Sequence, residues 1–345
     1  MTKRHGQLFD NMFTPEALYA AYLMARRGKR KKAAVAKFER DLGANLQALH
    51  AELHAGTYAP RPYKTFEVFE PKRRLIYAPH FRDVVVQHAI YSVIYPIFDA
   101  TFCRESYGCR VGLGTHKAAD RAQQFLRAAP ADSFFLQLDI RKFFYSIDRT
   151  VLMGLWARKV KDPRVLSLLA MFGNYPDPVG IPIGNLLSQL AALVYLNPLD
   201  HFIKRELGVK HYVRYVDDFI VFDLSQDEAH TMRRAIEDWL KATLHLELSK
   251  WTVLPVKRGF NFIGFRTWRK TRFVRKHTLC KFSRSLRSGN IPAVVSALGH
   301  ARHTASHRHF ARRIHTERPE LVAQLPLTTR LSFLSLQGAP QHAHL

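Results

Sequence analysis

The stretch HYVRYVDDFIVF, residues 211–222, places two acidic residues between two apolar runs that are typical of β-strands. Burying an ionised carboxylate is costly unless it is paired, and adjacent carboxylates also repel each other. Asp217 and Asp218 therefore either lie in an exposed hairpin turn, where Asp is well tolerated, or surround a bound cation. Both interpretations predict two strands that are joined by a turn at residues 216–218.

A third carboxylate ends another strand-like run. The stretch SFFLQLD, residues 133–139, reads as a buried strand that finishes at Asp139. A strand end and a hairpin turn can meet in space although they are far apart in the chain. Three carboxylates at one point would offer the oxygen ligands that hard divalent cations prefer. Two Mg²⁺ ions held in this way would support phosphoryl transfer and would offset the cost of burying the acidic pair.

The composition of the chain points to a polyanion as its partner. Among 345 residues, 53 Lys and Arg stand against 28 Asp and Glu, which leaves a net charge of +25. A hydrophobic content of 47% is enough for a substantial core and excludes wholesale disorder. A membrane surface is a weaker candidate, because no apolar run has transmembrane length. The start of the chain shows no apolar secretory segment, and the three cysteines form no CxxC pair, so we expect a reducing cytoplasm.

The remaining patterns predict an α+β fold. Helices are expected at 14–27, from about 33 to Leu53, at 82–98, after the Gly-rich loop SYGCRVGLGTHKA (106–118), at 185–206 and at 225–244. A β-hairpin is expected at 66–79 and two short strands in WTVLPVKRGFNFIGFRTW (251–268). The basic run RRGKRKK (26–32) is either a solvated connection or a phosphate-contacting patch. From Arg266 onward the chain is strongly basic, and Glu317 and Glu320 are its only acidic residues.

Several of these motifs together resemble one known family. LDIRKFFYSID (138–148), a helix-opening Ile-Gly loop, YVDD, ELSK (247–250) and NFIGF (261–265) occur in the order and spacing of the palm motifs of reverse transcriptases. KRRLIYAPHFRDVVVQHAI (72–90) and the Gly-rich loop resemble the fingers of bacterial group II-intron-type enzymes. The resemblance covers about residues 60–268.

The resemblance implies a right-hand polymerase architecture. N-terminal helices and fingers would occupy residues 1–132. The palm, with an antiparallel sheet and a YxDD hairpin, would occupy 133–268, including fingers-derived helices at about 150–178. A basic helical thumb would follow at 269–345.

The resemblance also assigns catalytic roles to matching residues. Asp139, Asp217 and Asp218, together with the Ile140 carbonyl, would bind two Mg²⁺ ions, with Mn²⁺ as a possible substitute. Lys250 would lie near the departing pyrophosphate; the alternative is an ordinary surface lysine at this position.

The pocket for the incoming deoxynucleotide would be lined by Lys72, Arg74, Ile140, Phe143, Phe144, Ile183, Gly184 and Gln189. Arg74 would grip the triphosphate, as bidentate Arg–phosphate bonding favours, while Lys72 and Arg73 are less defined candidates. Phe144 would exclude a nucleotide that carries a 2′-hydroxyl. The alternative is that Phe144 only packs in the core, although Phe143 beside it can serve that need. The primer grip would comprise Phe262, Ile263 and Gly264, with a plain buried strand as the alternative.

The stretch GIPIGNLLSQLAAL, residues 180–193, indicates which group of reverse transcriptases the chain resembles. Most members have Gln-Gly-x-x-x-Ser-Pro here, whereas this chain has Ile183 for the Gln and Gln189 for the Pro. This pattern resembles the enzymes of diversity-generating retroelements. It implies mutagenic retrohoming with errors opposite template adenines, a template-repeat RNA and a small basic accessory variability protein. A Gln at this position can hydrogen-bond to the incoming nucleotide, whereas an Ile contacts it by shape alone. The exchange would therefore weaken discrimination between nucleotides. The alternative is that Ile183 is a neutral hydrophobic replacement.

Two other functions remain open. One is a group II-intron-like or defence-associated reverse transcriptase of ordinary fidelity. The other is an inactive RNA-binding protein on a polymerase scaffold, which the intact aspartates and Phe144 argue against. His300, His303 and His307 would share one helix face, either as metal ligands or, as we favour, on a surface that faces nucleic acid.

Overall fold

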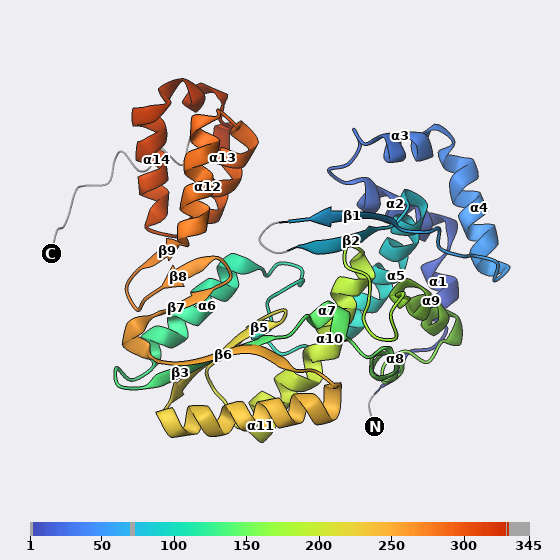
Figure 1. Ribbon diagram of the computed structural model, residues 1–345. Helices are drawn as coiled ribbons and strands as arrows, with labels where there is room; N and C mark the ends of the chain where they lie inside the picture. Colours follow the sequence, from blue (N-terminus) through green and yellow to red (C-terminus); the bar gives the residue numbers. More distant parts are fainter. Residues whose placement is uncertain (1–2, 70–72, 329, 331–345) are drawn as a thin grey trace.

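A computed structural model describes residues 3–69, 73–328 and 330 of the chain. Figure 1 shows a region built on a β-sheet with two lobes above it, one formed by N-terminal helices and a hairpin and the other by C-terminal helices. In the described part of the chain, no helix combines the length and the hydrophobicity that crossing a bilayer requires.

The N-terminal lobe consists of helices and one hairpin. Its helices are α1 (Leu8–Met12), α2 (Pro15–Arg26), α3 (Ala33–Arg40), α4 (Leu42–His54) and α5 (Phe81–Asp99), and its strands are β1 (Lys64–Val68) and β2 (Arg74–Ala78). The side chain of Thr14 caps α2 by accepting from the Ala17 N–H. The predicted antiparallel hairpin is confirmed. The single helix predicted up to Leu53 is wrong, because Asp41 leaves helical geometry with φ −122° and separates α3 from α4.

The central sheet has four antiparallel strands in the order β4-β5-β3-β6. They are β3 (Phe134–Ile140), β4 (Tyr212–Tyr215), β5 (Asp218–Leu224) and β6 (Leu248–Pro255). The side chains of β3 alternate between two hydrophobic clusters, with Phe135 in one and Leu136 and Leu138 in the other. Helix α6 (Thr115–Ala128) contributes to the first cluster, whereas α10 (Leu186–His201) and α11 (Gln226–Leu244) contribute to the second, so helices cover both faces.

The connections between these elements carry short helices and a second sheet. The helices are α7 (Phe143–Ser146), α8 (Arg149–Ala157) and α9 (Pro163–Gly173), and a π-helical turn at Phe202–Glu206 extends α10. Helix α11 begins at the expected position with a capping box of Ser225 and Glu228. The second sheet joins β7 (Phe260–Phe262), β8 (Phe265–Thr267) and β9 (Arg272–Val274). Residues 251–268 thus contribute to three strands rather than two, because the turn Val256–Arg258 and Gly259, with φ 62°, end β6.

The C-terminal lobe is a bundle of α12 (Lys276–Arg287), α13 (Ile291–Ala301) and α14 (Ser306–Glu317) with its own core. The rings of Phe282 and Phe310 stack at 3.9 Å within it. The prediction that three histidines share one helix face is wrong, because α13 ends before His303. His300 stacks on Phe265 at 4.4 Å, His303 is exposed and His307 is buried in α14.

Candidate active site

Strand register brings two of the predicted acidic residues together. Asp139, near the end of β3, lies opposite Asp218, the first residue of β5, and on its other side opposite Lys250 of β6. The backbone N–H of Ile140 donates to the Asp217 carbonyl at 3.2 Å, so the hairpin turn lies against the end of β3. Residues that are far apart in the chain therefore meet at one edge of the central sheet.

The acidic groups at this edge are electrostatically coupled. Burial raises the pKa of Asp218 to about 7, the amide of Gln137 opposes this by donating at 3.0 Å, and the charges of Asp139 and Asp217 raise it further. The hydroxyl of Ser249 donates to the Asp139 carboxylate and to its carbonyl. The sequence did not lead us to expect Gln137 or Ser249 as donors to these carboxylates. Ser249 lies within the ELSK motif, and that position was the signal that could have identified it.

The donor chemistry of this edge fits divalent cations. Within residues 3–69, 73–328 and 330, no three His, Cys, Asp or Glu side chains form a ready-made metal shell. A cation could be held by Asp139, Asp217, Asp218 and the Ile140 carbonyl. It would bind carboxylate oxygens of Asp139 and Asp218 that now accept hydrogen bonds from Ser249 and Gln137. Its charge would relieve the repulsion that raises the pKa of Asp218. When bound, such cations would activate an attacking hydroxyl and stabilise a leaving phosphate oxygen.

The turn that carries Asp217 is strained. Val216 adopts φ 57°, a conformation that is rare for a β-branched residue and persists only where its surroundings impose it. A guanidinium nitrogen of Arg214 donates to the Val216 carbonyl at 2.9 Å. On the other side Gly108 lies so close that an added Cβ would meet Val216 Cγ2 at 2.5 Å and its backbone N at 2.8 Å. The Gly-rich loop therefore has a glycine here because the turn packs against it.

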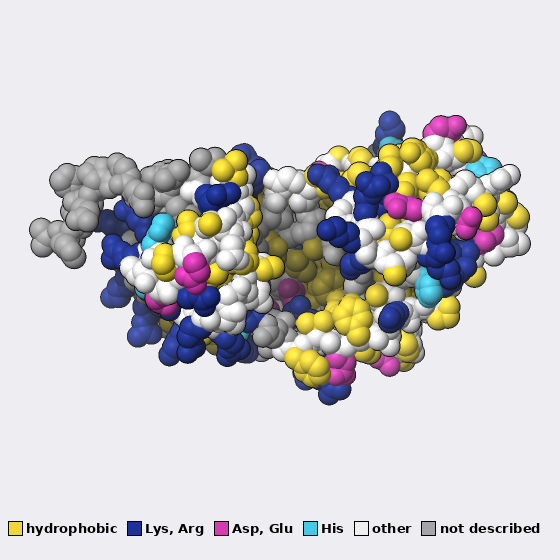
Figure 2. Space-filling model, turned by 90° about the horizontal axis from the view of Figure 1, so that it is seen from above, with side chains coloured by type: hydrophobic (Ala, Val, Ile, Leu, Met, Phe, Trp, Pro, Cys, Tyr) yellow, Lys and Arg dark blue, Asp and Glu magenta, His cyan; other side chains and the backbone are white. Residues whose placement is uncertain are grey.

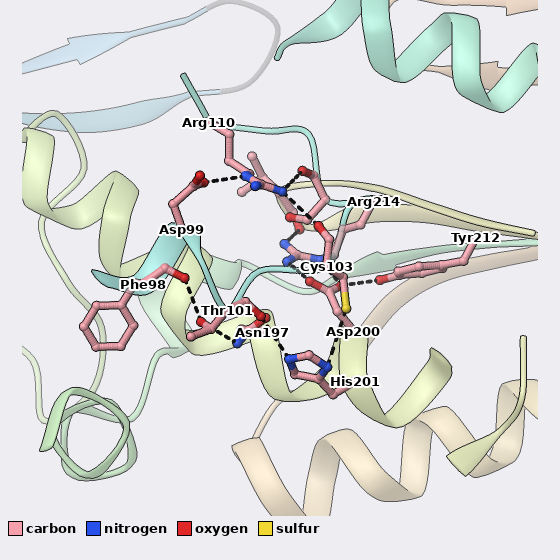
Figure 3. Close-up of polar contacts among 12 residues, drawn as sticks. Phe98, Asp99, Thr101, Cys103, Arg110, Asn197, Asp200, His201, Tyr212 and Arg214 are labelled. Atoms are coloured by element: carbon pink, nitrogen blue, oxygen red, sulfur yellow. Dashed lines mark hydrogen bonds and ion pairs between the residues drawn. The ribbon is translucent and has the colours of Figure 1, made fainter. Parts of the chain in front are cut away.

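A buried ion pair anchors this arrangement (Figure 3). Arg214 Nε donates to Asp200 Oδ1 at 2.6 Å, a second guanidinium nitrogen donates to Oδ2, and the Tyr212 hydroxyl donates to Oδ1 at 2.7 Å. Asp200 is 0% exposed and Arg214 is 1% exposed. Burial lowers the pKa of Arg214, but the charge and the hydrogen bonds of Asp200, together with Tyr212, outweigh this effect, and the net shift is upward. Helix α10 thus fixes the hairpin through Asp200. The sequence analysis did not single out Asp200, although an acidic residue in so apolar a helix was a signal of a buried ion pair.

The two predicted nucleotide-pocket phenylalanines differ in burial. Phe143 is 2% exposed and lies in the core, whereas Phe144 is partly buried at its edge. Their rings meet edge to face at 5.4 Å, and the Phe144 carbonyl accepts from the Ile181 N–H at 2.9 Å. Phe143 fills the core at this position, so part of the Phe144 ring remains accessible to a ligand.

The Ile-Gly loop packs against the N-terminal hairpin. The Tyr77 N–H donates to the Ile183 carbonyl at 2.7 Å. Gly184 has φ 119°, and an added Cβ would lie 2.8 Å from Ile76 Cγ2 and 3.1 Å from the Tyr77 carbonyl oxygen. A glycine is thus needed at 184 for a close approach to β2, and its place in the nucleotide pocket stays a prediction. Gln189 is exposed on α10 and Ile183 is half-buried.

The predicted basic residues occupy the hairpin and the sheet edge. Arg74 starts β2 and is exposed, and Arg73 pairs with Glu67 across the hairpin. Lys72 lies outside the described residues. Lys250 is exposed beside Asp139.

The predicted primer grip is a turn. Phe262 ends β7 and is buried, while Ile263 and Gly264 have φ 43° and 92° and lead into β8. The Gln137 amide donates to the Asn261 carbonyl at 2.9 Å as well as to Asp218, which couples this turn to the acidic edge. NFIGF therefore reverses the chain and is not one continuous strand.

Arg275 joins the acidic edge from the start of the C-terminal lobe. Its backbone N–H donates to the Gly264 carbonyl at 3.1 Å. Burial lowers the pKa of its guanidinium, and the charge of Asp218 acts against this shift. Sequence reasoning missed Arg275, because nothing distinguishes it from the other basic residues after Arg266. Figure 2 shows the molecule hollowed between the two lobes, with hydrophobic and acidic side chains on the floor of the hollow and Lys and Arg on both sides.

Comparisons with known proteins agree with this geometry. A family model described as reverse transcriptase (RNA-dependent DNA polymerase) matches residues 68–267. Protein YkfC of Escherichia coli (strain K12) is 26% identical over 280 residues, which cover 66% of this chain and 72% of YkfC. The group II intron-encoded protein LtrA of Lactococcus lactis subsp. cremoris is 26% identical over 212 residues, which cover 57% of this chain and 35% of LtrA.

A solved structure shares the fold. Telomerase from Candida albicans, in complex with a fragment of telomeric RNA, aligns with a TM-score of 0.51 over 81% of this chain and 57% of that one. The two are 12% identical in sequence, so this likeness concerns the fold alone.

Proposed function

Since the chain belongs to the reverse transcriptase family and is an RNA-directed DNA polymerase, we propose that it serves a diversity-generating retroelement. In this role it copies a template-repeat RNA into cDNA that carries substitutions at template adenines. The observation that carries the proposal is the pair Ile183 and Gln189, which replaces the usual Gln and Pro. The structure has Ile183 half-buried in a loop that contacts the fingers hairpin.

The proposed roles of the parts follow the right-hand plan. Residues 1–132 act as N-terminal helices and fingers, 133–268 as palm and 269–345 as a thumb that follows the template–primer backbone. The described portion of the last segment is a three-helix bundle, and its Arg275 lies next to the acidic edge. This arrangement gives the template RNA and the growing hybrid a path between the lobes.

At the catalytic edge, Asp139, Asp217 and Asp218 hold Mg²⁺, or Mn²⁺ in its place, with help from the Ile140 carbonyl. The chain's own part in the reaction is to orient these oxygens, and strand register and the anchored turn at Val216 support that role. Lys250, opposite Asp139, is placed to neutralise charge on departing pyrophosphate.

The nucleotide pocket selects by charge and by shape. Arg74 holds the triphosphate at the hairpin, and Phe144 excludes the ribose 2′-hydroxyl by occupying the space beneath the sugar. Phe262, Ile263 and Gly264 position the primer end, which the tie from Gln137 to both Asp218 and Asn261 supports.

Mutagenic copying follows from the chemistry of Ile183. An aliphatic side chain fits many base pairs and leaves no polar group unpaired when the wrong nucleotide enters. Discrimination between nucleotides is then reduced, while the aspartates remain competent. A small basic accessory variability protein and the template-repeat RNA are the expected partners.

An ordinary-fidelity enzyme of the group II-intron type is the second candidate. The 26% identity to LtrA favours it, although the chain spans about a third of that protein's length, so activities of the whole intron-encoded protein are not assigned here.

The test uses purified full-length protein with Mg²⁺, its cognate RNA and dNTPs, followed by sequencing of the cDNA. We expect substitutions concentrated opposite template adenines. Faithful cDNA would support the second candidate and overturn the first. The Asp218→Asn variant is the matched control, because it retains the shape of the residue and should bind RNA without making cDNA.

A further inference from the structure

A strongly basic groove lies along α6, beside the loop that packs against the hairpin turn of the acidic edge. It has a volume of about 660 Å³ and is lined by Arg104, Tyr107, Arg110, Leu113, Lys117, Asp120, Arg121, Gln124 and Arg127. One wall is the exposed face of α6, and the other is formed by Arg104 and the Gly-rich loop. None of these residues belongs to the aspartate site, the nucleotide pocket or the primer grip.

The carboxylates of the groove are already engaged. Asp120 pairs with Arg272 of β9 at 2.7 Å. Glu105 is 9% exposed and lies 3.7 Å from Arg121. Asp99 pairs with Arg110 at 2.8 Å, so Asp99 and Glu105 each compensate one of the cations in the groove. The five cationic side chains still outnumber Asp99, Glu105 and Asp120, which leaves a net positive surface.

The cations converge on Tyr107. Burial raises the pKa of this tyrosine, and the charges of Arg121, Arg104 and Arg110 all act to lower it. Its side chain is 7% exposed, so it offers little ring surface on which a base could stack. The groove thus presents guanidinium and ammonium groups, which recognise phosphate.

The position of the groove separates it from the primer. The opposite side of α6 faces the second sheet, where the Gln123 amide donates to the Trp268 carbonyl at 2.9 Å. The inner wall adjoins the catalytic hairpin, since the Tyr107 N–H donates to the Arg214 carbonyl at 2.9 Å and Gly108 touches Val216. A strand held here would be near the active site yet on the far side of α6 from the primer-grip turn.

We propose that this groove binds the ribose-phosphate backbone of an RNA strand without reading its bases. The inference rests on the proposed copying of RNA, because the RNA is the long polyanion present throughout that reaction. Its binding would be independent of sequence and strongly dependent on salt, since each phosphate contact releases counterions.

The test compares two double variants of equal charge. Arg104→Gln with Lys117→Gln changes the groove, and Arg234→Gln with Lys241→Gln changes exposed positions on α11, across the sheet. Binding of labelled single-stranded RNA is measured from about 0.05 to 0.3 M salt. We expect the slope of log affinity against log salt to fall by about 1.4 in the groove variant, at about 0.7 for each lost phosphate contact. At about 0.1 M salt this corresponds to a roughly 25-fold loss of affinity, with no change in the control variant.

An RNA slope equal to that of the control variant would overturn the proposal. Loss of affinity confined to single-stranded DNA of the same sequence, with RNA binding intact, would also overturn it. Thermal melting of both variants verifies that they fold. cDNA synthesis by the unaltered protein is scored separately: its absence would count against the proposed function and would leave the groove result standing.

Discussion

Replacing Asp200 by Asn tests whether the buried pair with Arg214 holds the catalytic hairpin in place. The substitution keeps the size of the side chain and removes its charge. Arg214 then remains buried with its positive charge uncompensated, because the pair is almost inaccessible to water, at 0% and 1% exposure. Three hydrogen bonds to the carboxylate, two from Arg214 and one from Tyr212, are weakened at the same time.

The expected loss is large on the scale of folding stability. Removing one partner of a buried ion pair costs about 3–5 kcal/mol. Since the free energy of unfolding of a domain is about 5–15 kcal/mol, Asp200→Asn should be among the most damaging single changes in the palm. A matched control is Asp10→Asn, which breaks an exposed ion pair with Arg164 whose side chains are 60% and 49% exposed, and should change stability far less.

A second variant separates stability from catalysis. Asp200→Leu combined with Arg214→Met replaces the ion pair by apolar side chains, which is often neutral or favourable for stability. It also removes the donor to the Val216 carbonyl, so the strained turn loses its tether. We therefore expect recovered stability with a low kcat, and a KM for dNTP close to that of the unaltered protein because Arg74, the proposed triphosphate contact, lies on the N-terminal hairpin.

The measurements are urea denaturation and steady-state incorporation of a single nucleotide on a preformed RNA–DNA primer-template. The reasoning is refuted if Asp200→Asn is as stable as Asp10→Asn. It is also refuted if the double variant keeps the kcat of the unaltered protein, since the turn would then need no tether.

Three further predictions concern single residues of the site. Burial and neighbouring charges raise the pKa of Asp218 from 3.8 to about 7, so the folded protein binds the extra proton and should lose stability as pH rises through this interval. Denaturation in EDTA at about pH 5 and about pH 8 checks this by comparison with Asp218→Asn, because buried histidines such as His88, whose pKa burial lowers, titrate in the same interval with the opposite sign. From about pH 5 to about pH 8 the change in stability should be less favourable in the unaltered protein than in the variant, and an equal change in both would refute the assignment to Asp218. Phe144→Ala should lower the preference for dNTP over NTP in kcat/KM by up to about 10²-fold, and an unchanged preference would make Phe144 a packing residue. Ile183→Gln should reduce substitutions opposite template adenine about tenfold in sequenced cDNA, whereas equal error rates would show a neutral exchange.

Local features of this fold were predictable because their signals are local. The cap at Thr14, the capping box at Ser225 and Glu228 and the hairpin at 66–79 depend on residues within a few positions of one another. The two strands around the acidic turn follow from alternation along residues 211–222. The break at Asp41 was missed, because helical periodicity continues on both sides of it.

The sequence by itself determined the candidate catalytic chemistry of this protein: two aspartates at strand ends and a third in a turn between strands, a basic composition, and a set of motifs in the order found in reverse transcriptases. Only the tertiary structure decided how that chemistry is held in place. Arg214 reaches Asp200 on another element, Gly108 meets Val216, and Arg275 approaches Asp218 from the C-terminal lobe. These contacts join residues with no fixed spacing, and their strength comes from exclusion of water, which depends on how the helices cover the sheet.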